Sequence, residues 1–265
     1  MKKGRVVVIL VWAILFVVLW ESVSWSLIHL FHDPMADSKL PYLHKVIAAL
    51  FSQGNVLLRE SFVTLLNSAF GFVLGAVVGI LLAILMSASR TIEEISFPYL
   101  ILSQMIPVLG LAPIVYGIVH DEIASRIIIS GYITFFPVSI NMLGSLKSVE
   151  KEKRELLYAY ATKPISVYTK LFLPASLPGL FSGLKIAAPL SVTAAILVEL
   201  MGAQHGIGVL ILRNLYYGPA QSSAFWASVL VSALLGILSF ELIVLAERIC
   251  LPWKASLAHE GGDGK

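Results

Sequence analysis

SFVTLLNSAFGFVLGAVVGILLAILMSAS, residues 61–89, is a stretch without a single charged side chain between Glu60 and Arg90. A helix needs about 20 predominantly apolar residues to cross the hydrocarbon core of a bilayer, and this stretch is longer than that. It does not alternate between apolar and polar residues, as a strand of a membrane barrel would over about 10 residues. The stretch therefore predicts a membrane-spanning helix, with its span at residues 62–86.

The rest of the chain has the same character. Of its 265 residues, 58% are hydrophobic and 13% are charged, and the mean hydropathy is +0.87. A soluble domain carries about 25% charged residues, so this composition indicates a protein of the lipid bilayer. We predict an all-α polytopic membrane helix bundle, a single transmembrane domain over residues 1–265. Its six spans are expected at residues 6–28, 62–86, 96–119, 127–146, 178–201 and 222–247.

The first span has an alternative interpretation. A basic start, an apolar run and small residues at Ser22, Ser24 and Ser26 are also typical of a cleaved signal peptide. Apolar residues resume at Trp25, and Trp is common at the membrane interface, which favours a retained span. Cleavage would not change the orientation of the other five spans.

The loops between the spans differ in positive charge. With the N-terminus in the cytoplasm, 13 of the 19 Lys and Arg residues fall on the inner side and five, Arg126 among them, on the outer side. Cytoplasmic loops carry an excess of Lys and Arg, so we predict that both termini are cytoplasmic. Residues 29–59 and 202–221 then form outer loops, and residues 147–175 form the most charged inner segment. The polar tail at residues 255–265 is predicted to be disordered.

Motifs for chemistry are missing from the sequence. It has no Gly-x-Ser-x-Gly, no His-Glu-x-x-His and no Gly-x-x-x-x-Gly-Lys-Ser/Thr pattern. The lone Cys250 cannot form an intrachain disulfide, and the six histidines lie in loops or tails, so we predict no metal site. The sequence has no basic face interleaved with aromatic residues, so nucleic acid is not an expected partner. We predict that the chain is not an enzyme and binds no cofactor of its own.

Few ionisable residues lie inside the predicted spans. Glu21 and Glu199 fall near the outer ends of their helices, and Lys185 lies in the fifth span. Each is expected to reach the interface or to pair with an opposite charge. A proton-coupled secondary transporter usually needs a buried carboxylate near mid-membrane, and none is evident.

Glycines recur every four residues in the second span. Gly71, Gly75 and Gly79 share one helix face, which lets a second helix approach closely, and Gly179 and Gly183 repeat the spacing. We predict that these glycines pack helices together. Pro107 and Pro113 in the third span, and Pro137 in the fourth, are expected to kink their helices.

The inner segment predicts a helical hairpin. A short helix is expected to end before Pro164, and a second to re-enter the membrane through Leu173 and Pro174. Leu156, Leu157 and Tyr160 share an apolar face on the first helix. Such a ridge indicates a docking site for another protein, although a helix lying on the lipid headgroups is the alternative.

In this segment the chain resembles the permeases of binding-protein-dependent ABC importers. Their pattern is Glu-Ala-Ala, three residues, Gly, nine residues, hydrophobic-x-Leu-Pro, which aligns here from Glu155 to Pro174. Leu156-Leu157 replaces the two alanines, and Ala161 replaces the glycine. Gln104-Met-Ile-Pro107 also resembles the family's third span. Val198-Glu199-Leu-Met-Gly202 is similar to the branch that imports nitrate, sulfonates, taurine and pyrimidine vitamin precursors.

The resemblance implies a mechanism. Two permease copies, as a homodimer in the bacterial plasma membrane, would form the solute pathway, and a separate cytoplasmic ABC ATPase would bind the ATP. Glu155 would pair with a basic group of the ATPase, with the docking ridge at Leu157, Tyr158, Ala161 and Thr162. An extracytoplasmic substrate-binding protein would deliver the solute to the outer loops. An ion-coupled secondary transporter or a channel is the alternative.

Overall fold

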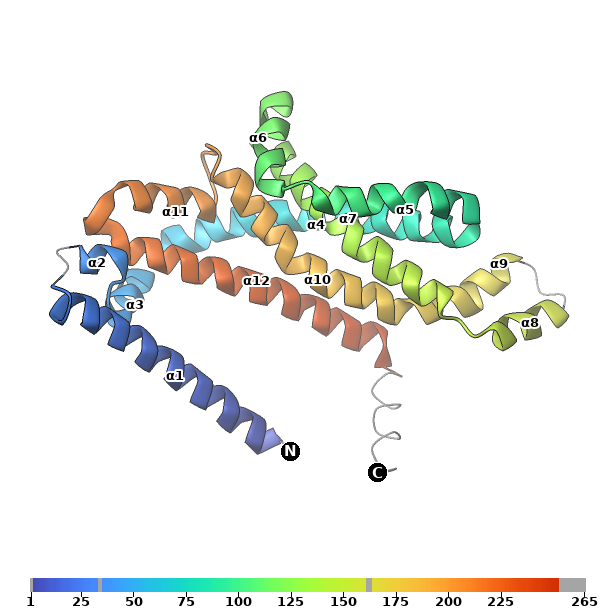
Figure 1. Ribbon diagram of the computed structural model, residues 1–265, viewed down its shortest axis with the longest axis horizontal. Helices are drawn as coiled ribbons and strands as arrows, with labels where there is room; N and C mark the ends of the chain where they lie inside the picture. The colour runs from blue at the N-terminus through green and yellow to red at the C-terminus, as the bar shows by residue number, and fades with distance from the viewer. Residues whose placement is uncertain (1, 33–34, 161–163, 253–265) are drawn as a thin grey trace. The chain divides into compact units, whose positions relative to one another are not determined.

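The computed structural model describes residues 2–32, 35–160 and 164–252, and in these ranges every regular element is a helix (Figure 1). The elements are α1 (Lys2–His29), α2 (Ala36–Lys39), α3 (Leu43–Ser52), α4 (Gly54–Ala88), α5 (Arg90–Met105), α6 (Val108–Val119), α7 (Glu122–Lys147), α8 (Lys151–Ala159), α9 (Pro164–Val167), the π-helix η1 (Tyr168–Phe172), α10 (Leu173–Glu199), α11 (Ile207–Tyr216), the 3₁₀-helix η2 (Gly218–Gln221) and α12 (Ser222–Cys250).

Within the described ranges, five helical stretches are long and apolar enough to cross a bilayer. They are Leu10–His29, Gly54–Ala88, Glu122–Lys147, Ile165–Glu199 and Gly218–Cys250. The pair α5 and α6 makes a sixth when it is taken as one broken span. The predicted all-α polytopic membrane bundle is thereby confirmed.

For residues 96–119 the sequence predicts one kinked helix, but the structure has two separate helices there. α5 ends at Met105, α6 begins at Val108, and the two helices are bent by 96° at the break. Pro107 lies in the break as the residue before the first turn of α6. Pro113 stays inside α6 without ending it. The first proline therefore separates two helices, whereas the second is tolerated within a helix.

The inner segment also differs from the predicted hairpin. The chain turns helical again at Pro164, and α9, η1 and α10 follow one another without a gap. The fifth span consequently begins well before residue 178, the start predicted from the apolar run. Proline suits the first turn of a helix, because its missing N–H has no intrahelical partner there. Single π-turns of this kind are frequent at functional sites.

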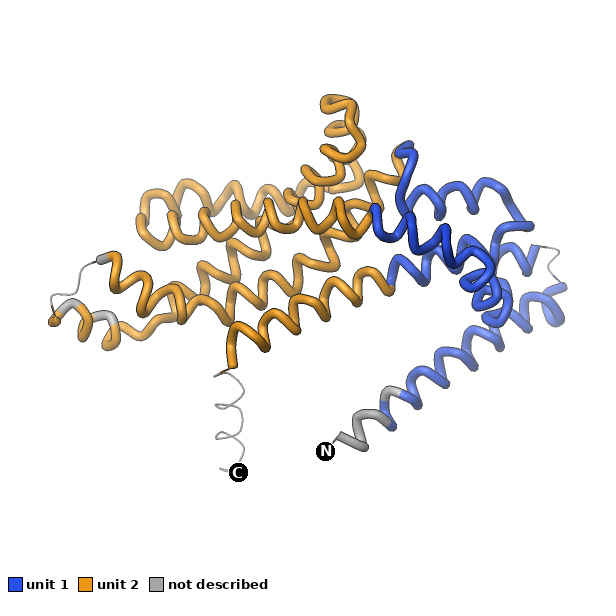
Figure 2. Tube along the Cα trace, turned by 180° about the vertical axis from the view of Figure 1, so that it is seen from behind, with its two compact units in different colours: residues 1–63, 202–233 blue, residues 64–201, 234–265 orange. Residues whose placement is uncertain are grey.

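The chain divides into two compact units (Figure 2). Unit 1 comprises residues 1–63 and 202–233, and unit 2 comprises residues 64–201 and 234–265. Unit 1 thus contains both segments predicted as outer loops. In this unit the Ser222 hydroxyl donates to the Asp37 carbonyl at 2.7 Å, and the Trp226 indole donates to the Lys39 carbonyl at 3.1 Å. These bonds join the start of α12 to α2.

Residues 202–221 are more ordered than the glycine-rich loop that the sequence suggests. They form α11 and η2, and the residue before α11 is Gly206 with φ of 122°. Only glycine adopts such a positive φ without strain. The glycine therefore permits the sharp entry into α11.

In unit 2, α7 packs against both α4 and α10 along faces of small residues. A Cβ at Gly71 would lie 2.5 Å from the Ser130 Cβ, and one at Gly183 would lie 2.5 Å from the Pro137 carbonyl oxygen. The Ser130 hydroxyl donates to the Ser191 carbonyl of α10 at 3.0 Å. In lipid, helices associate through close packing and such hydrogen bonds.

Substitution of Gly75 tests this close approach. A Cβ at Gly75 would lie 2.8 Å from the Thr134 Cβ and closer still to the Gly131 carbonyl oxygen, so α4 must move away from α7. We expect Gly75→Ala to destabilise the protein by about 1–3 kcal/mol, the usual cost of overpacking. Gly144→Ala is the control, because a Cβ at that position meets nothing within 4 Å. Equal thermal midpoints of the two purified variants in detergent would contradict the packing described.

Candidate functional site

The residues predicted to bind a partner lie on or beside α8, a short and strongly charged helix. Two ion pairs support its start, Lys153 with Glu150 at 3.1 Å and Lys151 with Glu155 at 3.5 Å. All four side chains are at least 60% exposed. Exposed pairs of this kind contribute little to stability and break easily. Because the Glu155 side chain is also exposed, its carboxylate is accessible to a partner.

Apolar side chains accompany these charges on α8. Leu156 is 57% exposed and Tyr160 is 75% exposed, one helical turn apart. Leu157 is half-buried. Tyr158 belongs to α8 by its backbone, but its side chain, like Ala161 and Thr162, lies outside the described residues. Of the predicted docking ridge, the structure therefore describes only the side chain of Leu157, while Glu155, Leu156 and Tyr160 beside it are exposed.

The segments on either side of α8 are fastened to unit 2. Before it, Lys147 at the end of α7 forms an ion pair with Glu93 of α5. After it, the hydroxyls of Tyr168 in η1 and Ser87 at the end of α4 lie 2.8 Å apart. Phe172 packs on an apolar cluster formed by α4, α5 and α7, whose buried members are Ala83, Met86, Leu100, Met142, Leu143 and Leu146. An exposed helix is thus held between anchored segments.

A second site is a buried polar cluster at the other end of unit 2. Arg126 of α7 and Glu199 of α10 are 1% and 0% exposed, with Arg126 Nε 3.8 Å from Glu199 Oε1. Arg126 Nη2 lies 2.8 Å from Glu122 Oε2. The Thr64 hydroxyl of α4 donates to the Glu199 carboxylate at 2.8 Å. The cluster therefore joins three helices, and its buried charges compensate one another.

Sequence reasoning missed this cluster. The sequence predicts Arg126 in the outer loop before a span starting at residue 127, because a charged residue ends a charge-free stretch. The structure instead begins α7 at Glu122 and buries Arg126 within it, with the Asp121 side chain accepting from the Ala124 N–H as a cap. The available signal was the spacing of Glu122 and Arg126, four residues apart on one helix face.

Lys185, which the sequence places inside a span, forms an ion pair with Glu247 of α12. Its Nζ lies 2.8 Å from Glu247 Oε2, and the two side chains are 22% and 12% exposed. The pair joins α10 to α12, so one charge offsets the cost of bringing the other into the bilayer.

In unit 1, two carboxylates fasten the predicted outer segments. Glu60 accepts a hydrogen bond from the Gly206 N–H at 2.7 Å, and His205 Nδ1 lies 3.6 Å from the same carboxylate. Glu21 accepts from the Leu43 N–H at the start of α3 at 3.0 Å. Both carboxylates stabilise the ends of helices, which shapes the surface where an extracytoplasmic partner is predicted to dock.

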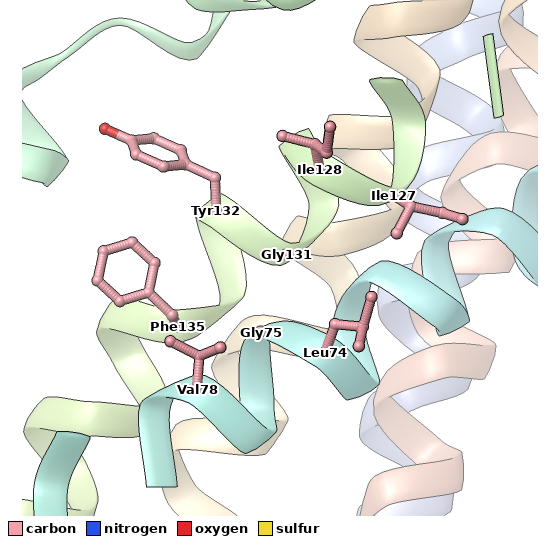
Figure 3. A pocket seen from close by; sticks show the side chains of 8 residues that line it. All are labelled: Leu74, Gly75, Val78, Ile127, Ile128, Gly131, Tyr132 and Phe135. Atoms are coloured by element: carbon pink, nitrogen blue, oxygen red, sulfur yellow. The ribbon is translucent and has the colours of Figure 1, made fainter. Parts of the chain in front are cut away.

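An open apolar groove of about 260 Å³ runs between α4 and α7 (Figure 3). Its lining residues are Leu74, Gly75, Val78, Ile127, Ile128, Gly131, Tyr132 and Phe135. Gly75 and Gly131 bear no side chains, and Tyr132 and Phe135 project from α7 on one side. The Tyr132 hydroxyl donates a hydrogen bond to the Ser103 carbonyl of α5. The groove is therefore apolar apart from one hydroxyl, which is already bonded.

Metal-ligating side chains do not gather in groups of three across residues 2–32, 35–160 and 164–252. His29, one of the two closest histidines in the sequence, packs its ring against Trp25 with the centroids 5.2 Å apart. The charged groups described above bind one another or backbone groups. The arrangement suits contacts between helices and with a partner protein.

Comparison with known proteins gives a consistent result. Residues 75–248 match the family model of the binding-protein-dependent transport system inner membrane component. The formylaminopyrimidine transport permease protein ThiX of Halalkalibacterium halodurans is 36% identical over 193 residues, which are 72% of this chain and 76% of the relative. The putative aliphatic sulfonates transport permease protein SsuC of Bacillus subtilis is 28% identical, over 75% of this chain and 71% of that protein.

A solved structure of an amino acid ABC transporter with histidines has the same fold. The alignment has a TM-score of 0.62 and 12% sequence identity, and it covers 76% of this chain and 97% of the other. The nitrate import permease protein NrtB of Synechocystis is 26% identical, over 73% of this chain and 70% of the relative.

Removal of Arg126 tests the buried polar cluster. Arg126→Ala would leave the Glu199 carboxylate buried without its cation, and breaking a buried pair in this way costs about 3–5 kcal/mol. We expect a much lower thermal midpoint in detergent. Arg90→Ala is the control, because Arg90 pairs with Glu94 through side chains that are 90% and 65% exposed, and its loss should leave the midpoint unchanged. Similar midpoints for both variants would exclude a stabilising buried pair.

Proposed function

Because the chain belongs to the family of inner membrane components of binding-protein-dependent transport systems, we propose that α8 is the helix through which it couples to a cytoplasmic ATPase. The chain is an ABC transporter permease, and its relatives are transport permeases rather than enzymes. In the proposal the ATPase binds and hydrolyses ATP, and this chain forms the solute pathway with a second copy of itself in the bacterial inner membrane.

One observation carries the coupling proposal: Glu155 is exposed beside Leu156 and Tyr160 on a helix whose flanking segments are anchored. An exposed carboxylate beside apolar side chains suits a cleft that offers a cation and apolar walls. Movement of the segment after α8 would be carried into α10, since α9, η1 and α10 are continuous from Pro164. A helix resting on anionic headgroups would gain little from the carboxylate.

For the solute, the names of the relatives suggest a class. They include permeases for formylaminopyrimidine, aliphatic sulfonates and nitrate. We propose a small solute of this kind, a pyrimidine-type vitamin precursor, an aliphatic sulfonate such as taurine, or nitrate, delivered by an extracytoplasmic binding protein. Titration of the purified binding protein with these compounds by calorimetry identifies the solute.

Reversal of the charge at Glu155 tests the coupling helix. We expect Glu155→Lys, co-expressed with the ATPase, to retain less than a tenth of the ATPase that the wild type retains on purification, because a like charge would face the ATPase's cation. Glu94→Lys is a matched control. Glu94 is also 65% exposed and also belongs to an ion pair between residues four apart, with Arg90, but it lies on α5.

Equal retention of the ATPase by both variants would contradict the role of Glu155. Uptake into proteoliposomes driven by a proton or sodium gradient without ATP would contradict the whole proposal and favour an ion-coupled secondary transporter.

The proposed orientation predicts which thiols are accessible from outside the cell. Cys250 is the single cysteine of the chain, lies exposed at the end of α12 and should face the cytoplasm. A membrane-impermeant maleimide should label it only after the cells are permeabilised. In a Cys250→Ser background, His44→Cys in the predicted outer segment should react in intact cells. Labelling of Cys250 in intact cells would invert the proposed topology.

A further inference from the structure

The end of α5 at the break leaves its last backbone carbonyls without intrahelical donors, and the carbonyl of Ser103 is one of them. In an unbroken α-helix the N–H of residue 107 would bond to the carbonyl of residue 103, four residues earlier. Residue 107 is Pro, which has no N–H. The Ser103 carbonyl therefore loses its intrahelical partner through the same residue that separates the helices.

Tyr132 of α7 supplies the missing donor. Its hydroxyl donates to the Ser103 carbonyl, and Figure 3 shows its side chain projecting from α7 beside Phe135. The backbone of α7 is fixed here, because Gly131 packs against Gly71 of α4. A rigid helix therefore holds the end of α5 through one hydroxyl.

The break itself is uncovered in the subunit. Gln104, Met105, Ile106 and Pro107 are all exposed, Met105 to 73%. Non-helical backbone at membrane depth is tolerated only where protein buries it or where it lines a water-filled cavity. The subunit does not bury these four residues, and hydrocarbon cannot solvate the peptide groups between two helices.

We propose that the break at residues 104–107 lines the aqueous route of the solute, and that Tyr132 is the positioning residue that holds α5 and α6 in their bent arrangement. The first part rests on the proposed transport function. The second part rests on the hydrogen bond and on the proline. Burial of the break by the second copy is the competing outcome of the test.

Spin labels at exposed positions on the two helices measure the bend. Ile95 of α5 and Ile118 of α6 are 60% and 74% exposed. At 1.5 Å per residue, these positions would be about 35 Å apart in a continuous helix and about 22 Å apart across the bend. Double electron–electron resonance on the full chain in a Cys250→Ser background distinguishes the two, and singly labelled variants reveal distances between copies.

Tyr132→Phe removes only the hydroxyl. We expect its distance distribution to broaden and its mean to lengthen by several ångströms. Ser103→Ala is the control, since it keeps the carbonyl, and it should match the wild type. Tyr132→Phe combined with Pro107→Ala restores a donor within the helix. We expect Tyr132→Phe to lower the thermal midpoint and the double variant to recover it. In the double variant the distance between the labels at residues 95 and 118 should move towards about 35 Å. A purely stabilising role of Tyr132 would not produce this combination.

Thiol accessibility tests the aqueous route separately. In reconstituted vesicles, Met105→Cys should react with a charged methanethiosulfonate at least tenfold faster than Ile237→Cys, whose parent side chain is exposed on the apolar face of α12. Equal rates would show that the break is covered, and an unchanged distance in Tyr132→Phe would remove its positioning role. Neither measurement uses ATP or the ATPase, so failure here leaves the test of Glu155 unaffected.

Discussion

The close contact of α7 with α4 and α10 is the constraint on which the rest of unit 2 depends. Lipid tails are as apolar as the helices, so helices gain little by hiding apolar side chains from lipid and must pack closely and share hydrogen bonds. Gly71 and Gly183 bring backbones together on the two sides of α7, and the Ser139 hydroxyl donates across to the Gly79 carbonyl at 3.1 Å. A larger side chain at either glycine would separate the helices and break these bonds.

This packing determines how movement can spread from the segment after α8. α8 is exposed, and from Pro164 onwards the chain is helical without a break through α9 and η1 into α10, which packs along α7. Tyr168 also joins η1 to the end of α4 through Ser87. A displacement of α9 and η1 is therefore shared by α10 and α4, two helices that are already packed against α7.

Apolar length predicts most of the helices because every charge left in hydrocarbon is costly. The same reasoning fails at Arg126, since length and charge alone do not reveal its partners: Glu122 is visible only as a residue four positions earlier, and Glu199 is distant in sequence. It fails again at the prolines. Pro107 breaks a span and Pro113 does not, and the residue type alone does not distinguish them; at Pro107 the Tyr132 hydroxyl of another helix bonds the Ser103 carbonyl, a contact that no local pattern shows. On α8, the sequence predicts the exposed Glu155 correctly because charge on a short helix keeps it at a surface.

The distribution of polar groups along the helices restricts how they can move. Arg126 pairs with Glu199 at the end of α10, and Lys185 in the middle of α10 pairs with Glu247 near the end of α12. Hydroxyls and glycines fill the contacts of α7 with α4 and α10. Sliding α10 by one turn, about 5.4 Å, would separate both pairs and leave buried charges uncompensated, which is strongly unfavourable. Tilting α4, α7 and α10 together keeps the contacts among these three helices, and it keeps the pair of Lys185 and Glu247 where that end of α12 moves with them. The charge pairs therefore permit rigid-body tilting of the three helices and oppose the sliding of one past another.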